Sequence, residues 1–284
     1  MKIALLLVAY KNSVEELSHT LDAWCSQKRA PDAFYVVANS PIKGYSAIAE
    51  RGIILEPEVN LGFAGGVNLA AERASSDSFS HILLSNIDIE MLSDETLARL
   101  VQAADQVPDA LAISPGISLW PEVSAVWYRG AYVSRPAWIS RHPGIGKPWT
   151  SITGDVRETG YFSGCCALID LQRFRALNGF AEDLFMYYDE ADLAERARAC
   201  GWRSYFIDEP LVAHEKADRG LSTVEAFYHA RNSARLLGVH ERGVRLLFGR
   251  IAQAAVSPLQ LARCRGWKSR SAYLRGYLTG TRSS

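Results

Sequence analysis

Short apolar runs alternate with amphipathic segments through the first 107 residues, and this alternation constrains the fold more than any other feature. Ile3–Tyr10 is a continuous apolar run, which is typical of a parallel strand buried on both faces. Val14–Gln27 follows it with apolar residues at helical spacing. The same pattern predicts further strands at 33–38, 52–55 and 81–84 and further helices at 66–75 and 93–107. We therefore predict an α/β fold in which helices flank a mostly parallel sheet and ligands bind at the carboxyl ends of the strands.

The second half of the chain has a less regular pattern. Residues 115–160 hold four tryptophans and five prolines without a clear period. This composition predicts a long excursion over one face of the sheet, either a functional wall or a structural insertion. After it, the pattern predicts strands at 165–171 and 202–207 and helices at 171–177, 189–200, 223–237 and 243–256.

The charges are unevenly distributed along the chain. The totals are 31 basic and 31 acidic residues, but residues 242–284 hold nine of the basic residues and none of the acidic ones. The first 241 residues therefore carry 22 basic against 31 acidic groups, a balance of −9. The neutral total excludes a protein that binds nucleic acid over its whole surface, and a 48% hydrophobic composition excludes disorder.

Cysteine usage and the N-terminal run indicate a cytoplasmic protein. The five cysteines show no CxxC or Cys/His metal spacing, so we predict reduced, buried thiols. The N-terminal apolar run has eight residues and no small-residue cleavage site after it, so a buried strand explains it better than a signal peptide. No apolar run approaches the ~20 residues that a membrane span needs.

Three glycines mark the segment Asn60–Asn68, with the sequence NLGFAGGVN. Glycines let a ligand approach the backbone, and a helix that begins at Gly66 would present free N–H groups to a phosphate. The spacing is neither GxGxxG nor a P-loop. A tight turn between strand and helix explains the segment at least as well.

Two polar segments follow predicted strands. In Ser85–Asp88, the carboxylate of Asp88, with Asn86 beside it, could hold a divalent ion that neutralises a diphosphate. A polar turn is the simpler alternative. In Val212–His214, the imidazole of His214 could ligate a metal, although a single histidine is more often structural.

An apolar and aromatic run delivers three carboxylates to the start of a predicted helix. Asp189 and Asp192 share one face of that helix, and Glu190 points elsewhere. Favourable interaction with the helix N-terminus explains at least one of these acids, but a carboxylate beside aromatic walls is also what a general base needs. Farther along the chain, Arg231 could pair with a phosphate, with a buried salt bridge as the ordinary alternative.

In this order, the segments resemble the inverting glycosyltransferases of the GT-A fold, family 2, particularly the rhamnosyltransferase-like branch. The resemblance covers roughly residues 3–237. The matching segments are VAYKN (8–12), NLGFAGGVN (60–68), SNID (85–88), TGYFSGCCALI (159–169), GFAEDLFMYYDEADLAERARACGW (179–202), VAH (212–214) and YHARN (228–232). It implies a GT-A domain at 1–241, with a nucleotide-sugar-binding half at 1–114 and an acceptor and catalytic half at 115–241. Residues 242–284 would then be a basic helical extension.

The resemblance also implies roles for individual residues. Asp88 would coordinate Mn2+ or Mg2+ on the donor diphosphate, and His214 would complete the metal shell. The base would be Glu190 or Asp189, because the order here is Asp–Glu where the family usually has Glu–Asp with the second residue as the base. Arg231 is a candidate diphosphate contact. The nucleotide sugar would contact Ala9, Tyr10, Asn39, Asn60, Gly62, Gly65, Gly66, Asn68, Asn86 and Asp88, and the acceptor would contact Phe162, Gly164 and Cys165.

The implied activity is a single displacement at the anomeric carbon of a sugar, with inversion. The donor would be a dTDP- or UDP-linked sugar, with rhamnose suggested by the branch, and the acceptor a glycan or lipid-linked hydroxyl in surface polysaccharide synthesis. Ala38 stands where the family typically has an aspartate near the nucleotide. This departure and the Asp–Glu order motivate one alternative, a catalytically impaired nucleotide- or glycan-binding component of an assembly complex. A sugar nucleotidyltransferase is a third option, disfavoured because no basic glycine-rich signature lies near the N-terminus.

The basic extension has two explanations. Its apolar residues recur at helical spacing with arginines among them, so it could lie on the cytoplasmic face of an anionic membrane. Alternatively, it packs on the main domain or on a second copy in a homodimer. No interleaved motif supports binding to nucleic acid.

Overall fold

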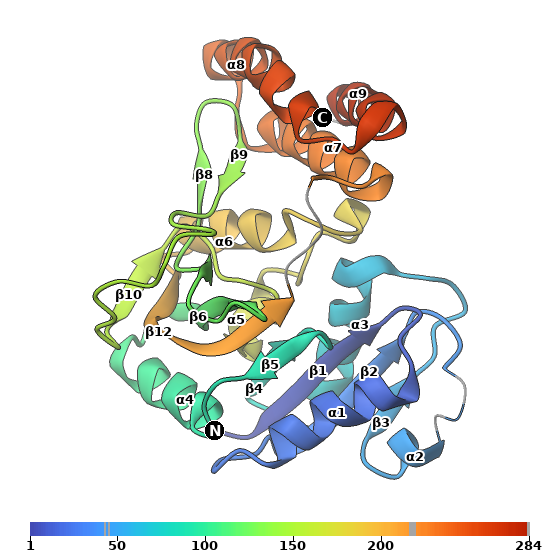
Figure 1. Cartoon of the computed structure of the whole chain (residues 1–284), viewed down its shortest axis with the longest axis vertical. Coiled ribbons are helices and arrows are strands. Elements are labelled where there is room, and N and C mark those ends of the chain that lie inside the picture. Colours follow the sequence, from blue (N-terminus) through green and yellow to red (C-terminus); the bar gives the residue numbers. More distant parts are fainter. Residues whose placement is uncertain (43, 45, 216–219, 283–284) are drawn as a thin grey trace.

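The computed structural model describes residues 1–42, 44, 46–215 and 220–282, which contain a large mixed sheet (Figure 1). The strand order is β10-β12-β6-β11-β4-β1-β2-β3, with β5 paired to β12, β7 paired to β6, and β8-β9 as a separate hairpin. The strands are β1 (Ile3–Ala9), β2 (Ala33–Ala38), β3 (Ile53–Leu55), β4 (His81–Ser85), β5 (Ile89–Met91), β6 (Ala110–Trp120), β7 (Val126–Tyr128), β8 (Tyr132–Ser134), β9 (Ile139–Arg141), β10 (Val156–Thr159), β11 (Cys166–Asp170) and β12 (Arg203–Glu215). The helices are α1 (Val14–Cys25), α2 (Ser46–Ala49), α3 (Gly62–Ser76), α4 (Thr96–Gln106), α5 (Leu171–Ala176), α6 (Asp189–Ala199), α7 (Thr223–His240), α8 (Gly243–Ala262) and α9 (Gly266–Arg282), with a 3-10 turn at Glu182–Leu184.

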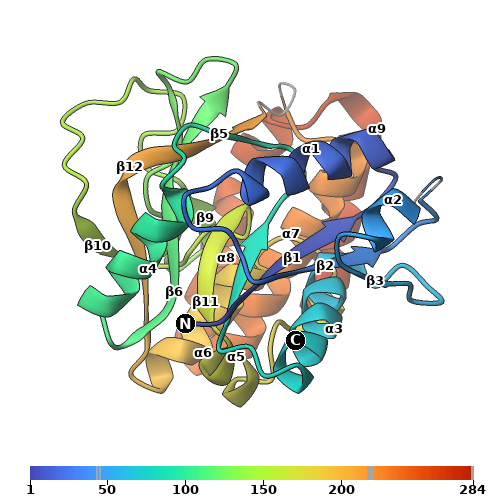
Figure 2. The ribbon, with the colours of Figure 1, turned by 90° about the horizontal axis from the view of Figure 1, so that it is seen from below.

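The N-terminal part of the sheet is parallel, as the apolar runs predict. β1 pairs in parallel with β2 and β4, and β2 pairs in parallel with β3. Because side chains alternate across a strand, Leu5 and Leu7 pack on the side of α1 and Leu6 packs on the side of α3. Figure 2 shows α1 and α3 on opposite faces of these strands. The carboxyl ends of β1, β2 and β4 therefore meet at one edge of the sheet.

The other part of the sheet brings two distant segments to that edge. β11 runs antiparallel to β4 and β6, and β6 runs parallel to β12. β12 continues well beyond the predicted end at residue 207, and its last residues pair antiparallel with β5. Because β5 begins one residue after Asp88, this pairing places Asp88 beside His214 near the end of β12.

The predicted excursion at 115–160 is only partly irregular. Its first residues belong to β6, which lies between β11 and β12 in the sheet. Pro115 and Gly116 interrupt the apolar pattern of this strand, so the pattern alone does not reveal it. Gly116 is required by close packing, because a Cβ there would lie 2.6 Å from the Glu209 carbonyl oxygen. The segment predicted as an excursion without a clear period therefore contains the end of β6 and also β7, β8, β9 and β10.

Three helices at the C-terminus pack together at one end of the molecule (Figure 1). α9 lies against α7 through small residues, and a Cβ on Gly276 or Gly280 would collide with the carbonyl oxygen of Phe227 or Arg231. The extension at 242–284 is helical, as predicted: the helix predicted at 243–256 continues through Pro258 to Ala262, and α9, whose bounds were not predicted, follows it. Residues 283 and 284 of the predicted extension lie outside the described residues. Among the helices described, none is long and apolar enough to cross a membrane.

The cysteines are only partly as predicted. All five are free thiols, and Cys165, Cys166 and Cys264 are buried. The prediction of burial is wrong for Cys25 and Cys200, which lie at the exposed ends of α1 and α6.

Candidate active site

Hydrogen bonds with distant parts of the chain hold the loop Ser85–Asp88. The Thr20 hydroxyl on α1 donates to the Ile87 carbonyl at 2.7 Å. The N–H of Asn86 donates to the Cys165 carbonyl at 2.8 Å. The side chains of this loop therefore project from a fixed strand end.

Asp88, which directly precedes β5, lies beside His214, which is near the end of β12. His214 Nε2 lies 3.2 Å from Asp88 Oδ1 and 3.3 Å from Asn86 Nδ2. His214 Nδ1 donates to the Glu215 carbonyl at 2.9 Å. The imidazole therefore presents Nε2 to the carboxylate.

The electrostatics of this pair favour opposite charges. Burial would raise the pKa of Asp88, but the hydrogen bond and charge of His214 lower it overall. Burial would lower the pKa of His214, but its interactions with Cys165 and Asp88 raise it. Burial raises the pKa of the Cys165 thiol, which is therefore uncharged at neutral pH. Asp88 is thus the charged partner of His214.

These side chains fit part of a divalent cation site. A cation would meet His214 at Nε2, where it would replace a proton. The 3.2 Å between Nε2 and Asp88 Oδ1 is close to the ~3 Å that separates adjacent ligands at about 2.1 Å from an ion. In the described part of the chain, no group of three or more His, Cys, Asp or Glu side chains is arranged to hold a metal. Water and substrate phosphate oxygens would therefore have to complete the shell, as they commonly do for Mg2+.

The segment before α6 has an uncommon backbone. Phe185, Tyr187 and Tyr188 have φ angles of 66°, 65° and 69°. This left-handed region costs such residues about 1–3 kcal/mol each. Rings from α7 support the segment: Phe185 stacks on Tyr228 and Tyr187 stacks on His229, with centroids 5.2 and 4.4 Å apart.

A buried asparagine on α7 fixes the same segment. Asn232 Nδ2 lies 3.0 Å from the Leu184 carbonyl oxygen, 2.8 Å from that of Met186 and 2.9 Å from that of Tyr187. One amide group therefore lies within hydrogen-bond distance of three carbonyl groups of an otherwise unfavourable loop. The loop delivers the first residues of α6 to the same edge of the sheet as Asp88.

Asp189 and Glu190 begin α6 in different surroundings. Glu190 Oε1 accepts a hydrogen bond from the Gly164 N–H at 2.9 Å, and a Cβ on Gly164 would collide with that oxygen. Asp189 is buried, and its Oδ1 has no hydrogen-bond partner within the described residues. Burial, followed by the charge of Glu190, raises the pKa of Asp189 well above its usual range. Burial also raises the pKa of Glu190, with backbone hydrogen bonds opposing it.

One cavity of about 530 Å³ brings these elements together. The predicted site residues that line it are Asn86, Asp88, Phe162, Gly164, Cys165, Asp189, Glu190 and His214. The tryptophan-rich segment contributes Trp127, whose ring lies 4.6 Å from the His214 ring. That segment therefore forms a wall of the cavity, which is one of the two roles predicted for it.

The glycine loop differs from its prediction. α3 begins at Gly62 and not at Gly66, and the N–H groups of Phe63 and Ala64 donate to the Phe185 carbonyl at 2.8 and 3.4 Å. The expectation of free N–H groups at this helix start is therefore wrong, because the segment before α6 occupies them. Gly62 has a φ of 71°, and a Cβ there would collide with the same carbonyl oxygen.

Two predicted donor contacts have their amide groups engaged elsewhere. Asn39 donates to the Gly62 carbonyl at 2.8 Å and accepts from the Leu61 N–H at 3.1 Å. Asn68 donates to the Phe180 carbonyl and accepts from the Phe180 N–H, both at 2.9 Å. The predicted contacts that lie outside the cavity lining, and that stay predictions, are Ala9, Tyr10, Asn39, Asn60, Gly62, Gly65, Gly66, Asn68 and Arg231.

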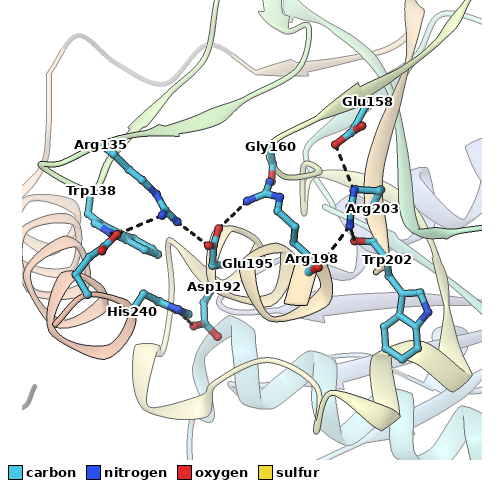
Figure 3. Close-up of polar contacts among 11 residues, drawn as sticks. Arg135, Trp138, Glu158, Gly160, Asp192, Glu195, Arg198, Trp202, Arg203 and His240 are labelled. Carbon is cyan, nitrogen blue, oxygen red and sulfur yellow. Dashed lines mark hydrogen bonds and ion pairs between the residues drawn. The ribbon is translucent and has the colours of Figure 1, made fainter. Parts of the chain in front are cut away.

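Asp192 has a structural role in α6. Its carboxylate lies 2.8 Å from both His240 Nε2 and Arg196 Nε. One turn farther on, Glu195 pairs with Arg135 at 2.6 Å. Figure 3 shows the contacts of Asp192 with His240 and of Glu195 with Arg135, which link α6 to the end of α7 and to the turn between β8 and β9. Asp192 therefore anchors the helix that carries the two candidate bases.

Some residues of the site have no counterpart in the sequence prediction. Asn232 lies in the matched segment YHARN, where only its neighbour Arg231 was expected to act. His142 lines the cavity, with its Nε2 3.0 Å from the hydroxyl of Tyr161, which itself lies in the matched segment 159–169. His142 lies in the segment without a clear period, so its only signal in the sequence is its place in that tryptophan-rich segment.

We expect Asn232→Ala to lower the free energy of unfolding by about 1–3 kcal/mol, because three buried carbonyl groups lose their donor. Hydrogen exchange should accelerate in residues 184–190. The matched control is Val239→Ala, at an exposed position of the same helix, which should stay within about 0.5 kcal/mol of the wild type. Unchanged exchange at 184–190 in Asn232→Ala would contradict the assignment.

Comparison with known proteins supports this architecture. No protein-family model matches the chain. Over 187 residues, the chain is 27% identical to the N-acetylglucosaminyl-diphospho-decaprenol L-rhamnosyltransferase of Mycobacterium tuberculosis, found in two strains. The match covers 58% of this chain and 59% of the relative, so the chain spans less than two thirds of the length of the relatives it matches.

Solved structures with the same fold are glycosyltransferases. GalNAc-T7 with UDP, GalNAc and Mn2+ has a TM-score of 0.67 at 14% identity, covering 95% of this chain and 55% of that one. The mannosyltransferase PcManGT from Pyrobaculum calidifontis, with GDP-Man and Mn2+, has a TM-score of 0.58 at 14% identity, covering 99% and 83%. TarS 1–349 from S. aureus has a TM-score of 0.55 at 13% identity, covering 99% and 73%. The chain thus has the GT-A fold of glycosyltransferases and is similar in sequence to a rhamnosyltransferase.

Proposed function

We propose that this protein transfers a sugar from a nucleoside-diphosphate donor to an acceptor hydroxyl, with inversion at the anomeric carbon. The observation that carries the proposal is that Glu190 and the Asp88–His214 pair line the same cavity. The reaction needs a base for the acceptor hydroxyl and positive charge at the leaving diphosphate, and this cavity offers groups for both.

Glu190 is the base in this proposal. The Gly164 N–H holds its Oε1 and leaves Oε2 to accept the hydroxyl proton. Asp189 is buried with an unpartnered oxygen, and the raised pKa favours its protonated form. A neutral Asp189 lets its neighbour ionise, because two adjacent buried carboxylates do not both carry a charge cheaply.

Asp88 and His214 are the candidate metal ligands, with Asn86 beside them. A bound Mn2+ or Mg2+ would supply positive charge to the departing nucleoside diphosphate. The Mn2+ in the structures of GalNAc-T7 and PcManGT supports the use of a divalent cation by this fold. The loop bonds to Ile87 and Asn86 keep the ligands in place before the donor arrives.

The sequence relative suggests the substrate class. It is named for the transfer of L-rhamnose to a sugar carried by a diphosphate-linked polyprenol. We infer that this protein uses a dTDP- or UDP-linked sugar, with rhamnose as the first choice, and a lipid-linked or glycan acceptor of surface polysaccharide synthesis. The same proposal places a domain boundary between residues 241 and 242 and assigns catalysis to residues 1–241.

We expect Glu190→Gln to lower kcat about 10²–10⁴-fold while donor binding persists, because the amide keeps the Gly164 hydrogen bond but cannot take a proton. Asp189→Asn should cost less, since an amide resembles a protonated carboxyl group. Transfer assays with donor and acceptor in excess measure both. A different result would support the catalytically impaired alternative. In that case the wild type, Glu190→Gln and Asp88→Ala would all bind donor but show equally little transfer.

The pH profile gives a separate test of Glu190. The base acts only when ionised, so kcat should fall as the pH drops through its pKa. Because burial raises that pKa, the fall should occur above the ~4.3 of an ordinary glutamate. The assignment would be contradicted if the kcat of the wild type fell with an apparent pKa at or below that of an ordinary glutamate.

We expect UDP or dTDP to raise the melting temperature of the protein more with Mn2+ than with EDTA, since ligands that bind only the native state stabilise it. Asp88→Asn should remove the Mn2+-dependent part of the shift, and Glu190→Gln should retain it. An equal shift with Mn2+ and with EDTA in the wild type would rule out a metal at Asp88.

We also propose that α8 contacts an anionic membrane. Leu247, Phe248 and Ile251 are 61, 60 and 57% exposed on one side of this helix. Residues 242–282 include nine basic side chains and no acidic one. An exposed apolar stripe among arginines is typical of helices that lie in a membrane interface. α9 packs closely on α7, so its position needs no membrane to explain it. The membrane proposal therefore rests on α8 alone.

We expect the triple variant Leu247→Ser, Phe248→Ser, Ile251→Ser to float less with anionic vesicles than the wild type, because the stripe loses its apolar area. All three residues are exposed, so the fold should persist. The matched control replaces exposed apolar residues elsewhere, Val59→Ser with Ile152→Ser, and should float like the wild type. Equal flotation of both variants would remove the membrane assignment.

A further inference from the structure

A second cavity, of about 490 Å³, adjoins the catalytic one. It lies between the β9 end of the hairpin and the helices α7, α8 and α9, in the upper part of Figure 1. Four residues line both cavities, namely Ser140, His142, Tyr188 and His229. The two cavities are therefore adjacent, and these four side chains form a partition at their common boundary.

The partition is joined to the catalytic loop. The Ser140 N–H donates to the Tyr188 hydroxyl at 3.2 Å, and Tyr188 is the residue that precedes α6. The His229 ring stacks on Tyr187 and is half-buried. Glu190 follows Tyr188 by two residues, so a ligand that spans the partition would have one end near Glu190.

The lining of the second cavity combines positive charge with apolar surface. Arg141 and Arg263 line it, and no Asp or Glu is among its described lining residues. Arg263 Nη1 donates to the Gln260 side chain at 3.0 Å, and neither arginine has an ion-pair partner among the described side chains. Ile139, Val256 and Leu259 supply apolar surface beside them.

The apolar side of this cavity continues onto the surface of α8. Leu259 lines the cavity and is 70% exposed, so it lies at the rim. Earlier on the same helix, Phe248 and Ile251 are also exposed. An anion bound at the arginines would therefore have an apolar surface leading away from it toward the exterior.

We propose that this second cavity binds the diphosphate and the first isoprenoid units of a polyprenyl-diphosphate-linked acceptor. The diphosphate would pair with Arg141 and Arg263, the chain would leave past Leu259, and the acceptor sugar would extend through the partition toward Glu190. This assignment deepens the proposed function and rests on it. A nucleotide fits less well, because it would leave the apolar rim without a partner.

The first test measures binding, which does not depend on catalysis. Farnesyl diphosphate is titrated into the full chain by calorimetry, with farnesol and inorganic pyrophosphate as the two partial ligands. We expect farnesyl diphosphate to bind more tightly than either, since only it offers both charge and an apolar chain. The double variant Arg141→Gln, Arg263→Gln should weaken this binding at least about tenfold, because each charge-assisted hydrogen bond is among the stronger contacts.

Three further variants locate the binding. Leu259→Asp, at an exposed rim position, should also weaken farnesyl diphosphate through charge repulsion and lost apolar contact. Arg245→Gln, an exposed arginine on the same helix outside the lining, is the matched control and should bind like the wild type. Asp88→Asn should bind like the wild type as well. The proposal is overturned if farnesyl diphosphate binds the arginine double variant as tightly as the wild type. It is also overturned if Asp88→Asn abolishes this binding.

The second test separates this inference from the proposed function. Transfer is measured to an acceptor sugar on a polyprenyl diphosphate and to the same sugar on a short neutral alkyl group. The double variant Arg141→Gln, Arg263→Gln should raise KM for the first acceptor at least about tenfold more than for the second. Equal effects on both acceptors sink the inference and leave the transferase proposal standing. Farnesyl diphosphate binding that needs the arginines, in a wild type that transfers to neither acceptor, sinks the transferase proposal alone.

Discussion

The site depends on a short stretch of left-handed backbone before α6. Phe185, Tyr187 and Tyr188 each adopt a conformation that costs a bulky residue about 1–3 kcal/mol. The cost is offset from α7, by the amide of Asn232 and by two stacked rings. α7 therefore positions the candidate catalytic residues indirectly, since it holds the loop that directs Glu190 toward Gly164.

The same stretch also organises the opposite side of the site. The Phe185 carbonyl accepts the N–H groups of Phe63 and Ala64, which closes the start of α3. The glycine at 62 is needed because any side chain would collide with that carbonyl. α3, α6 and α7 thus meet at one loop, and a change in that loop would be felt at both the candidate donor side and the candidate base. Asp192, paired with His240, adds a second connection between α6 and α7.

The sequence predicts the elements whose stability is local and misses those that depend on distant partners. β1, β2 and β4 are evident because each is an apolar run next to an amphipathic helix. β6 is not, because Pro115 and Gly116 break its pattern and only its pairing with β12 makes it a strand. α9 lies in the extension predicted to be helical, but no local pattern gives its bounds, because its glycines are unfavourable in an isolated helix and stabilise it only through close packing against α7. Within the site, Asp88, His214 and Glu190 follow from motif order, but Asn232 acts on residues 45 to 48 positions away, which no local pattern reveals.

The Asp–Glu order, which departs from the family's usual Glu–Asp, is consistent with this geometry. Asp189 is short and stays buried with an unpartnered oxygen, where its own proton is the simplest way to avoid a buried charge. Glu190 is one methylene longer and reaches the N–H of Gly164, a position where a Cβ would collide with its carboxylate. The longer base therefore requires a glycine across the cavity, and both are present. In the proposed reaction, Glu190 acts from a position fixed by the backbone N–H of Gly164, just before β11.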